Sequence, residues 1–223
     1  MKAVALTHYL PVTDPNAFLD VDLPKPVPSG RDILVAVKAV SVNPVDTKVR
    51  APKDTVEETP RVIGYDASGI VEAVGADVTL FKAGDEVYYA GDITRSGTNQ
   101  EFHLVDERIV GFKPKSLGFA EAAALPLTTI TAYEAFFDRL GIDRDGADKG
   151  QSILIIGAGG GVGSIGIQLA KAAGLVVIAT ASRPETTAWV KQLGADHVVN
   201  HREDMVAQVR ALGFQHVDHI AIF

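Results

Sequence analysis

A cluster of five glycines within seven residues constrains the fold of this chain more than any other feature. The glycines occupy positions 157, 159, 160, 161 and 163. The apolar, β-branched run Ile153–Ile156 precedes them and predicts a strand. After them, apolar residues recur at steps of three and four, which indicates one buried face of a helix, and Gly174 follows as its C′ residue. The stretch therefore predicts a strand, a glycine turn and a helix.

The glycine turn fits the dinucleotide-binding fingerprint when Ala158, Gly160 and Gly163 take its three small positions. Small residues there let the backbone approach a pyrophosphate at the helix N-terminus. The predicted cofactor contacts in the turn are Ala158, Gly159, Gly160, Gly161, Val162 and Gly163. The alternative is a generic parallel α/β turn in which glycine only allows tight helix packing.

The residues that follow support the nucleotide-binding interpretation. We expect a second strand at Leu175–Ala181, a helix from Pro184 to Leu193 that Gly194 ends, and a third strand at His197–Asn200. A helix at His201–Leu212, ended by Gly213, and a fourth strand at Asp218–Phe223 complete the pattern. A doubly wound domain commonly has about six strands. Because an apolar sheet edge is normally covered, we expect the chain to be a fragment, truncated after its fourth Rossmann strand.

The first half of the chain has a different character. Strands are expected at 2–6, 33–42, 67–74, 86–90 and 100–105. Prolines between residues 11 and 28 predict an extended surface excursion there rather than a helix. From Phe119 the pattern becomes helical, Pro126 interrupts it, and Thr128–Leu140 follows as a second helix. We therefore expect two domains, 1–125 and 126–223.

The composition narrows the classes of partner. The formal net charge is -7 and no segment concentrates Lys and Arg, which argues against a nucleic-acid surface and favours a small-molecule partner. Cysteine is absent, so disulfides, a thiol nucleophile and cysteine-ligated zinc are excluded within this sequence. The opening MKAVAL is too short for a signal peptide, and no stretch is long enough to cross a membrane. We expect a cytoplasmic protein.

Four ordered motifs resemble those of one known superfamily. They are NPVD at 43–46, IGYDASGIVEAVG at 63–75, AAALPLTTITAYEA at 122–135 and GAGGGVGSIGIQLAKAAG at 157–174. With them the chain resembles the medium-chain dehydrogenase/reductase superfamily, and within it the zinc-independent quinone oxidoreductase branch. The resemblance implies an α/β fold with a β-barrel: a GroES-like substrate domain, then a Rossmann domain, with the active site in the cleft between them. It also implies a homodimer or homotetramer.

The resemblance also addresses metal binding. Aligning the motifs puts Asn43, Tyr65 and Leu127 where zinc-dependent relatives carry cysteine, histidine and cysteine. Leucine cannot ligate, and amide and phenol groups are poor zinc ligands beside thiolate and imidazole. The pairs His197/His201 and His216/His219 have spacings that suit a metal on a helix, but the first pair straddles a strand end. We therefore expect no zinc.

The choice of cofactor follows from the residues at the end of the second strand. An NAD site usually presents a carboxylate about twenty residues past the turn, whereas Ser182 and Arg183 stand there. A hydroxyl and a guanidinium suit a 2′-phosphate, so NADPH is expected over NADH. Glu185 is a nearby carboxylate that opposes this choice. Alternatively, Ser182 caps the next helix in a capping box, which leaves Arg183 free.

The simplest chemistry is hydride transfer from the dihydronicotinamide to an electron-poor acceptor. By resemblance, Thr131 lies beside the nicotinamide, His201 near the adenosine, and Asn43, Asp46 and Tyr65 line the substrate pocket. Tyr65 is the expected hydrogen-bond donor to a quinone or enone oxygen. Four of these residues have a structural alternative. Tyr65 could be a packed barrel tyrosine, and Asp46 could only brace the loop after Val42. Thr131 could be a plain helix threonine, and His201 could be an ordinary surface turn residue.

Three functions remain open on the sequence. The first is an NADPH-dependent reductase of quinones or α,β-unsaturated carbonyls. The second is a zinc-type alcohol dehydrogenase, and the third is a nucleotide-binding sensor or structural protein with little turnover. Fold alone cannot choose among them, because function must be argued from the site.

Overall fold

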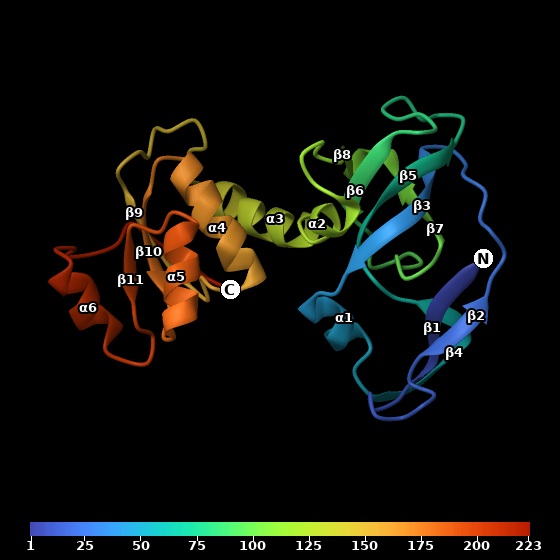
Figure 1. Ribbon diagram of the computed structural model, residues 1–223, viewed down its shortest axis with the longest axis horizontal. Helices are drawn as coiled ribbons and strands as arrows, with labels where there is room; N and C mark the ends of the chain where they lie inside the picture. Colours follow the sequence, from blue (N-terminus) through green and yellow to red (C-terminus); the bar gives the residue numbers. More distant parts are fainter. The chain divides into compact units, whose positions relative to one another are not determined.

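The computed structural model describes residues 1–223. The chain divides into two compact units, Met1–Leu127 and Thr128–Phe223, which we call unit 1 and unit 2. Figure 1 shows unit 1 in blue to green and unit 2 mainly in yellow to red. None of the helices has the length and apolar character required to cross a membrane.

Unit 1 is built from two antiparallel sheets. The first has the order β2 (Leu19–Asp22), β1 (Lys2–Tyr9), β4 (Lys53–Val62). The second has the order β7 (Phe102–Asp106), β3 (Asp32–Ser41), β5 (Asp66–Val74), β6 (Glu86–Ala90), β8 (Val110–Phe112). A bridge between Ala3 and Gln100 joins them. Buried aliphatic side chains such as Ile33, Val35 and Val87 fill the second sheet's core, and the GroES-like barrel expected from the sequence is confirmed.

Short helices connect the strands of unit 1. They are α1 (Pro44–Val49), the 3₁₀ turn η1 (Glu107–Ile109) and α2 (Phe119–Ala123). The next helix, α3 (Pro126–Tyr133), leads into the π-helical segment η2 (Glu134–Arg139). The sequence-based helix start at Thr128 was wrong, because proline is well tolerated in the first turn and Pro126 begins α3 instead of interrupting it.

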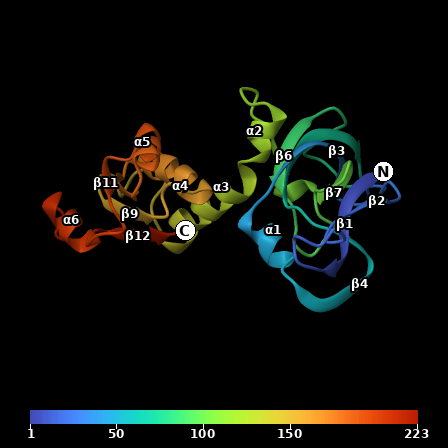
Figure 2. The ribbon, with the colours of Figure 1, turned by 60° about the horizontal axis from the view of Figure 1, so that its bottom comes forward.

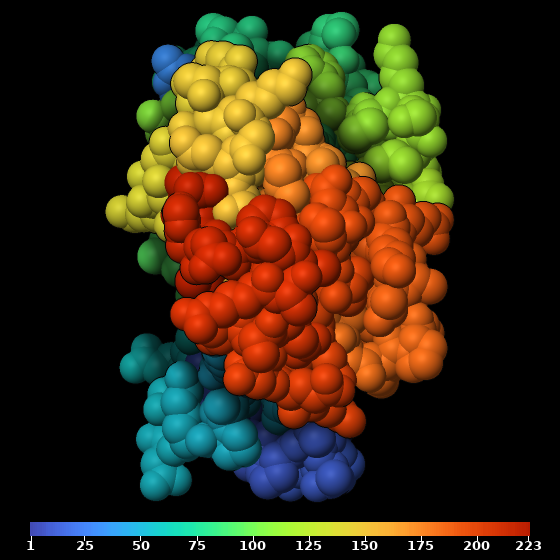
Figure 3. All heavy atoms as spheres, turned by 90° about the vertical axis from the view of Figure 1, so that its left-hand side faces the viewer, coloured from blue at the N-terminus to red at the C-terminus, as the bar shows by residue number.

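Unit 2 contains one parallel sheet in the order β11 (His197–Val199), β10 (Val176–Thr180), β9 (Ser152–Ile156), β12 (His219–Ile222). The helices α4 (Gly161–Ala172), α5 (Pro184–Gln192) and α6 (Met205–Ala211) connect its strands. Figure 3 shows the surface that the residues coloured orange to red form in this unit.

Buried apolar side chains pack on both faces of the unit 2 sheet. Ile153 and Ile155 of β9 pack in one cluster with Ile167 of α4 and Val190 of α5. Leu154, between them, belongs to a second cluster with residues of β10, β11 and α6. Because neighbouring strand residues point to opposite faces, α4 and α5 cover one side and α6 the other, as Figure 2 also shows. This is the doubly wound Rossmann arrangement predicted from the glycine turn.

The expected helix at His201–Leu212 begins four residues late. Asp204 occupies the N-cap position, and its side chain accepts hydrogen bonds from the backbone N–H groups of Val206 and Ala207. Residues 201–203 form a turn in which the Asn200 side chain accepts from the Arg202 N–H. An aspartate that satisfies free N–H groups fixes a helix start, so α6 begins at Met205.

Candidate functional site

The glycine turn of unit 2 is shaped by close backbone packing. Gly157 has φ +80°, a conformation that favours glycine, and Gly160 is the N-cap of α4. A Cβ atom on Gly163 would lie 2.5 Å from the carbonyl oxygen of Gly157, and Ala158 is fully buried beneath the turn. These contacts explain why small residues stand at the three fingerprint positions Ala158, Gly160 and Gly163.

The outer surface of the turn lines an open pocket of about 440 Å³. Its walls are Ile156, Gly157, Gly159, Gly160, Thr180, Ala181, Ser182, Arg183, Thr186, His201, Arg202 and Phe223. The N-terminus of the twelve-residue helix α4 begins here without an acidic residue in its first turn. Free backbone N–H groups and the helix dipole together favour an anion, so the residues present fit the pyrophosphate of a dinucleotide.

Thr186 on α5 helps to shape this pocket. A Cβ atom on Gly159 would lie 2.3 Å from the Cγ2 atom of Thr186, so glycine is required for the two segments to approach. The Thr186 hydroxyl also lies 3.4 Å from the Arg183 guanidinium. Thr186 therefore connects the phosphate turn with the cation expected at the 2′-phosphate.

Two arginines, Arg183 and Arg202, stand at the edge of the pocket. Both are exposed, and the Arg183 Nε atom lies 3.1 Å from Oε1 of Glu185. The N-cap of α5 is Arg183, so the alternative that Ser182 caps this helix was wrong. Ser182 stays half-buried in the pocket wall, one residue before the helix boundary. Both neighbours thus remain placed for contact with a ligand.

The other residues predicted to contact the cofactor occupy different positions in unit 2. His201 is exposed and lines the same pocket. Gly161 and Val162 lie in the first turn of α4, and Val162 is half-buried. Thr131 lies on α3 with an exposed side chain and is not part of this pocket wall. The predicted contact between Thr131 and nicotinamide therefore stays a prediction.

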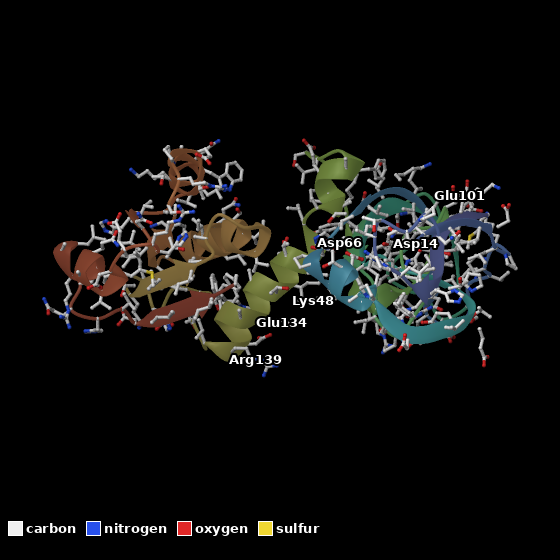
Figure 4. All side chains as sticks on the ribbon, turned by 90° about the horizontal axis from the view of Figure 1, so that it is seen from below. Asp14, Lys48, Asp66, Glu101, Glu134 and Arg139 are labelled. Atoms are coloured by element: carbon white, nitrogen blue, oxygen red, sulfur yellow. The ribbon has the colours of Figure 1, made fainter.

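In unit 1, pairing of β3 with β5 brings the predicted substrate residues together. Ser41, at the end of β3, lies opposite Asp66, the first residue of β5. Asn43 therefore follows one strand end while Tyr65 directly precedes the other. Asn43, Asp46, Tyr65 and Asp66 are all buried, and Asp66 is completely inaccessible. Figure 4 labels Asp66 inside unit 1, near α1 and the first residues of α3.

Hydrogen bonds join three of these side chains. The Asn43 amide nitrogen donates to Oδ2 of Asp66 at 2.8 Å, and the Asn43 backbone N–H donates to Oδ2 of Asp46 at 2.7 Å. The Asp46 carboxylate thus braces the loop after Val42. Its predicted place in the substrate pocket stays a prediction. Oδ1 of Asp46 is buried and has no hydrogen-bond partner in the protein. Asn43 is thus held through both its backbone and its side chain.

Burial controls the protonation of the cluster. It raises the pKa of the Asp66 carboxyl, and the hydrogen bond from Asn43 is the largest opposing effect. It raises the pKa of Asp46 in the same way. The pKa of Tyr65 is also raised by burial, with Arg61 opposing the rise and Asp46 adding to it. Tyr65 accordingly keeps its proton at neutral pH and can donate a hydrogen bond.

The residues at the positions aligned with zinc ligands do not fit a metal. The Asn43 amide nitrogen donates one N–H to Asp66 and cannot ligate a metal, while Leu127 carries no ligating atom. No group of three or more His, Asp or Glu side chains is arranged to hold an ion.

Sequence reasoning missed Asp66, Arg202 and Thr186. Asp66 stands directly after Tyr65 at the head of an apolar strand, and a carboxylate in that position was a usable signal. Arg202 directly follows His201, which was predicted to lie near the adenosine after the third strand. That prediction could have been extended to Arg202, which lines the same pocket. Thr186 gave no signal, because its contact with Gly159 depends on how α5 packs.

Two family models match the chain. One describes the alcohol dehydrogenase GroES-like domain and matches residues 29–134. The other describes a zinc-binding dehydrogenase and matches residues 161–222. Their order along the chain is the order of unit 1 and unit 2.

Curated relatives match most of the chain. A zinc-type alcohol dehydrogenase-like protein of Staphylococcus aureus strain Mu50 is 49% identical over 221 residues, which cover 99% of this chain and 65% of the relative. The 2-methylene-furan-3-one reductase of Solanum lycopersicum is 41% identical over 183 residues, covering 77% of this chain and 45% of that protein. The chain thus spans less than two thirds of these relatives' length.

Solved structures share the fold. A protein of Rhizobium etli CFN 42, named as a candidate zinc-dependent alcohol dehydrogenase, is 60% identical with a TM-score of 0.93, and the match covers 100% of this chain and 65% of that one. The quinone oxidoreductase of Escherichia coli, solved in complex with NADPH, is 28% identical with a TM-score of 0.77, covering 96% and 63%.

Proposed function

The chain belongs to the medium-chain dehydrogenase/reductase superfamily, in its quinone oxidoreductase branch, and on that premise we propose that it is an NADPH-dependent reductase of quinones or α,β-unsaturated carbonyls. The observation that carries the proposal is the open pocket on the glycine turn, with Arg183 and Arg202 at its edge. The similarity to an NADPH-bound quinone oxidoreductase and to a furanone reductase supports the same class.

In this proposal the glycine turn and the α4 N-terminus bind the pyrophosphate, while the two arginines receive the 2′-phosphate. Guanidinium groups suit this task because they make charge-assisted, bidentate hydrogen bonds to phosphate oxygens. NADH lacks the 2′-phosphate and would leave Arg202 without an anionic partner. NADPH is therefore the proposed cofactor and NADH the weaker one.

When bound, the dihydronicotinamide supplies the hydride. Tyr65 donates a hydrogen bond to the acceptor oxygen, where negative charge develops as the carbonyl is reduced. Burial raises the pKa of this hydroxyl, so it stays protonated and can donate to the acceptor oxygen. Asn43 contributes a second polar group whose direction is fixed by Asp46 and Asp66. Burial of Tyr65 and Asn43 keeps water away from the acceptor.

Acceptor-dependent NADPH oxidation by the purified, metal-free protein tests the proposal. We expect turnover with 1,4-benzoquinone, 9,10-phenanthrenequinone or a simple enone, faster with NADPH than with NADH and unchanged by a chelator. Binding of NADPH without turnover would favour a sensor or structural protein. Activity that requires added zinc and an alcohol would establish the dehydrogenase named for several relatives.

A further inference from the structure

Asp66 is a buried acid that does not itself contact the acceptor in the proposed chemistry. Its side chain is fully inaccessible and forms no ion pair in unit 1. Removing a carboxylate from water is costly unless hydrogen bonds compensate for the lost hydration. An acid in such a position therefore requires an account of what its two oxygens do.

The two oxygens of Asp66 accept hydrogen bonds from different parts of unit 1. Oδ2 accepts from the Asn43 amide at 2.8 Å and from the Ser41 hydroxyl at 3.3 Å. Oδ1 accepts from the backbone N–H of Leu127 at 2.9 Å. A carboxylate accepts at both oxygens, whereas an asparagine side chain has one acceptor and one donor. With the Asn43 amide in this orientation, a carboxylate accepts from both Asn43 and Leu127, whereas an asparagine at position 66 accepts from only one of them.

We propose that Asp66 is a positioning residue for the reductase, holding the Asn43 amide in the one orientation that presents its remaining N–H and its carbonyl oxygen to the substrate. This inference rests on the proposed function. Asp46 fixes the Asn43 backbone, and Asp66 fixes the rotation of the same residue's side chain. A polar group held before the substrate arrives costs no reorganisation during the reaction.

A double-mutant cycle in the full chain tests the proposal, with Asp66→Asn, Asn43→Ala and the pair combined. In Asp66→Asn, only one acceptor oxygen remains for the two donors, the Asn43 amide and the Leu127 N–H. The Asn43 amide therefore loses its fixed orientation. We expect kcat to fall at least about tenfold in each single variant, and the double variant to be no slower than Asn43→Ala. The Kd for NADPH is expected to stay unchanged.

Thr98→Val serves as the matched control. The Thr98 hydroxyl donates to the backbone carbonyl of Asp66 at 3.3 Å, so this variant disturbs the same buried segment without touching the carboxylate. We expect its kcat to equal that of the wild type. Losses that multiply in the double variant, or a fully active Asp66→Asn, would overturn the inference.

Amide NMR separates this inference from the proposed function. With ¹⁵N-labelled asparagine, one side-chain N–H proton of Asn43 is expected downfield because it bonds to a carboxylate, and Asp66→Asn should move it upfield while Thr98→Val does not. A wild type without NADPH oxidation would refute the reductase and leave this readout intact. An Asn43 resonance that does not move in Asp66→Asn would refute the positioning role.

Discussion

The Nε atom of Arg183 lies 3.1 Å from the Oε1 atom of Glu185, so one cation of the proposed phosphate site is already paired with a carboxylate. Both side chains are about two-thirds exposed. Exposed pairs contribute little to stability, on the order of 0–1 kcal/mol. In the proposed phosphate site we expect Glu185 to act mainly on the ligand, because it competes with a 2′-phosphate for the same guanidinium and repels that phosphate.

Replacing Glu185 with glutamine should strengthen the preference for NADPH. Loss of the competing charge is expected to raise the ratio of NADPH to NADH affinity about three- to tenfold. Fluorescence titration of both nucleotides measures the ratio. Asp145→Asn, an exposed site outside the pocket wall, makes the same charge change and should leave the ratio unaltered. Equal effects of Glu185→Gln on both nucleotides would contradict the competition.

Arg202→Ala should weaken NADPH binding and spare NADH. A hydrogen bond to a charged group contributes about 1.5–3 kcal/mol, so the Kd for NADPH is expected to rise about tenfold or more. The salt dependence of NADPH binding should also become shallower. Calorimetric titration gives both quantities. Arg210→Ala removes an exposed arginine of α6 outside the pocket and is the control, whereas an equal loss of NADH affinity would exclude a 2′-phosphate contact.

Alanine variants of two glycines in the turn should differ in whether a second substitution can restore their stability. An alanine at 159 meets only the Cγ2 atom of Thr186, so Gly159→Ala should cost about 1–3 kcal/mol, and Thr186→Ser should recover much of it. An alanine at 163 meets the backbone of Gly157 and Ala158, which no side-chain change relieves. Denaturant unfolding compares the variants. Recovery of stability in Gly163→Ala by Thr186→Ser would contradict the backbone contact at position 163.

The fold of unit 2 could be predicted because local and long-range signals agree there. Continuous apolar runs marked the strands, and Gly174, Gly194 and Gly213 marked the helix ends. All three glycines adopt positive φ after α4, α5 and α6. Each element thus carried its own boundary signal.

Unit 1 was harder to predict, because the strands that the sequence analysis did not predict lie at sheet edges. These strands are β2, β4 and β8. The strand β4 (Lys53–Val62) carries several charged residues and is mostly exposed, so it shows neither an apolar run nor a clean alternation. Its pairing with β1 also shifts register between Leu6 and Tyr9. Backbone pairing rather than side-chain pattern defines such a strand.

The residues of the candidate site could be predicted where they belong to a recognised sequence motif. Tyr65 and Asn43 came from the motifs, but Asp66 acquires its role only because β5 pairs with β3 and sets it opposite Ser41. Ser182 shows the reverse case: its sequence fits a capping box, yet Arg183 is the N-cap. Local patterns identify candidates, and strand register and helix starts decide among them.

Tyr65→Phe should reduce turnover without affecting cofactor binding. The variant removes one hydroxyl from a buried ring, so we expect kcat to fall about ten- to a hundredfold while the Kd for NADPH stays constant. Because burial raises the pKa of Tyr65, the wild-type rate should not decline through phenol ionisation near neutral pH. Tyr88→Phe, on a different strand, is the control. Unchanged kcat in Tyr65→Phe would assign the ring to packing alone.

His103 provides a pH-dependent contribution to stability that is separate from the site. Its Nε2 lies 2.9 Å from the carbonyl oxygen of Ser96, which can only accept, and its Nδ1 lies 3.0 Å from the Tyr89 hydroxyl. The buried ring is therefore neutral, donating to Ser96 and accepting from Tyr89. Burial lowers the pKa of His103 from 6.5 to about 4.

Between pH 6.5 and about 4, the unfolded chain binds a proton at His103 that the folded chain does not. The free energy of unfolding should therefore fall as the pH falls through this window, by about 3 kcal/mol from this residue. His103→Gln removes the titration, so its unfolding free energy should vary less with pH than that of the wild type. Urea unfolding across the window measures both slopes. His216→Gln, at an exposed side chain, should retain the wild-type slope, and a His103→Gln slope equal to it would mean that His103 is protonated in the folded protein.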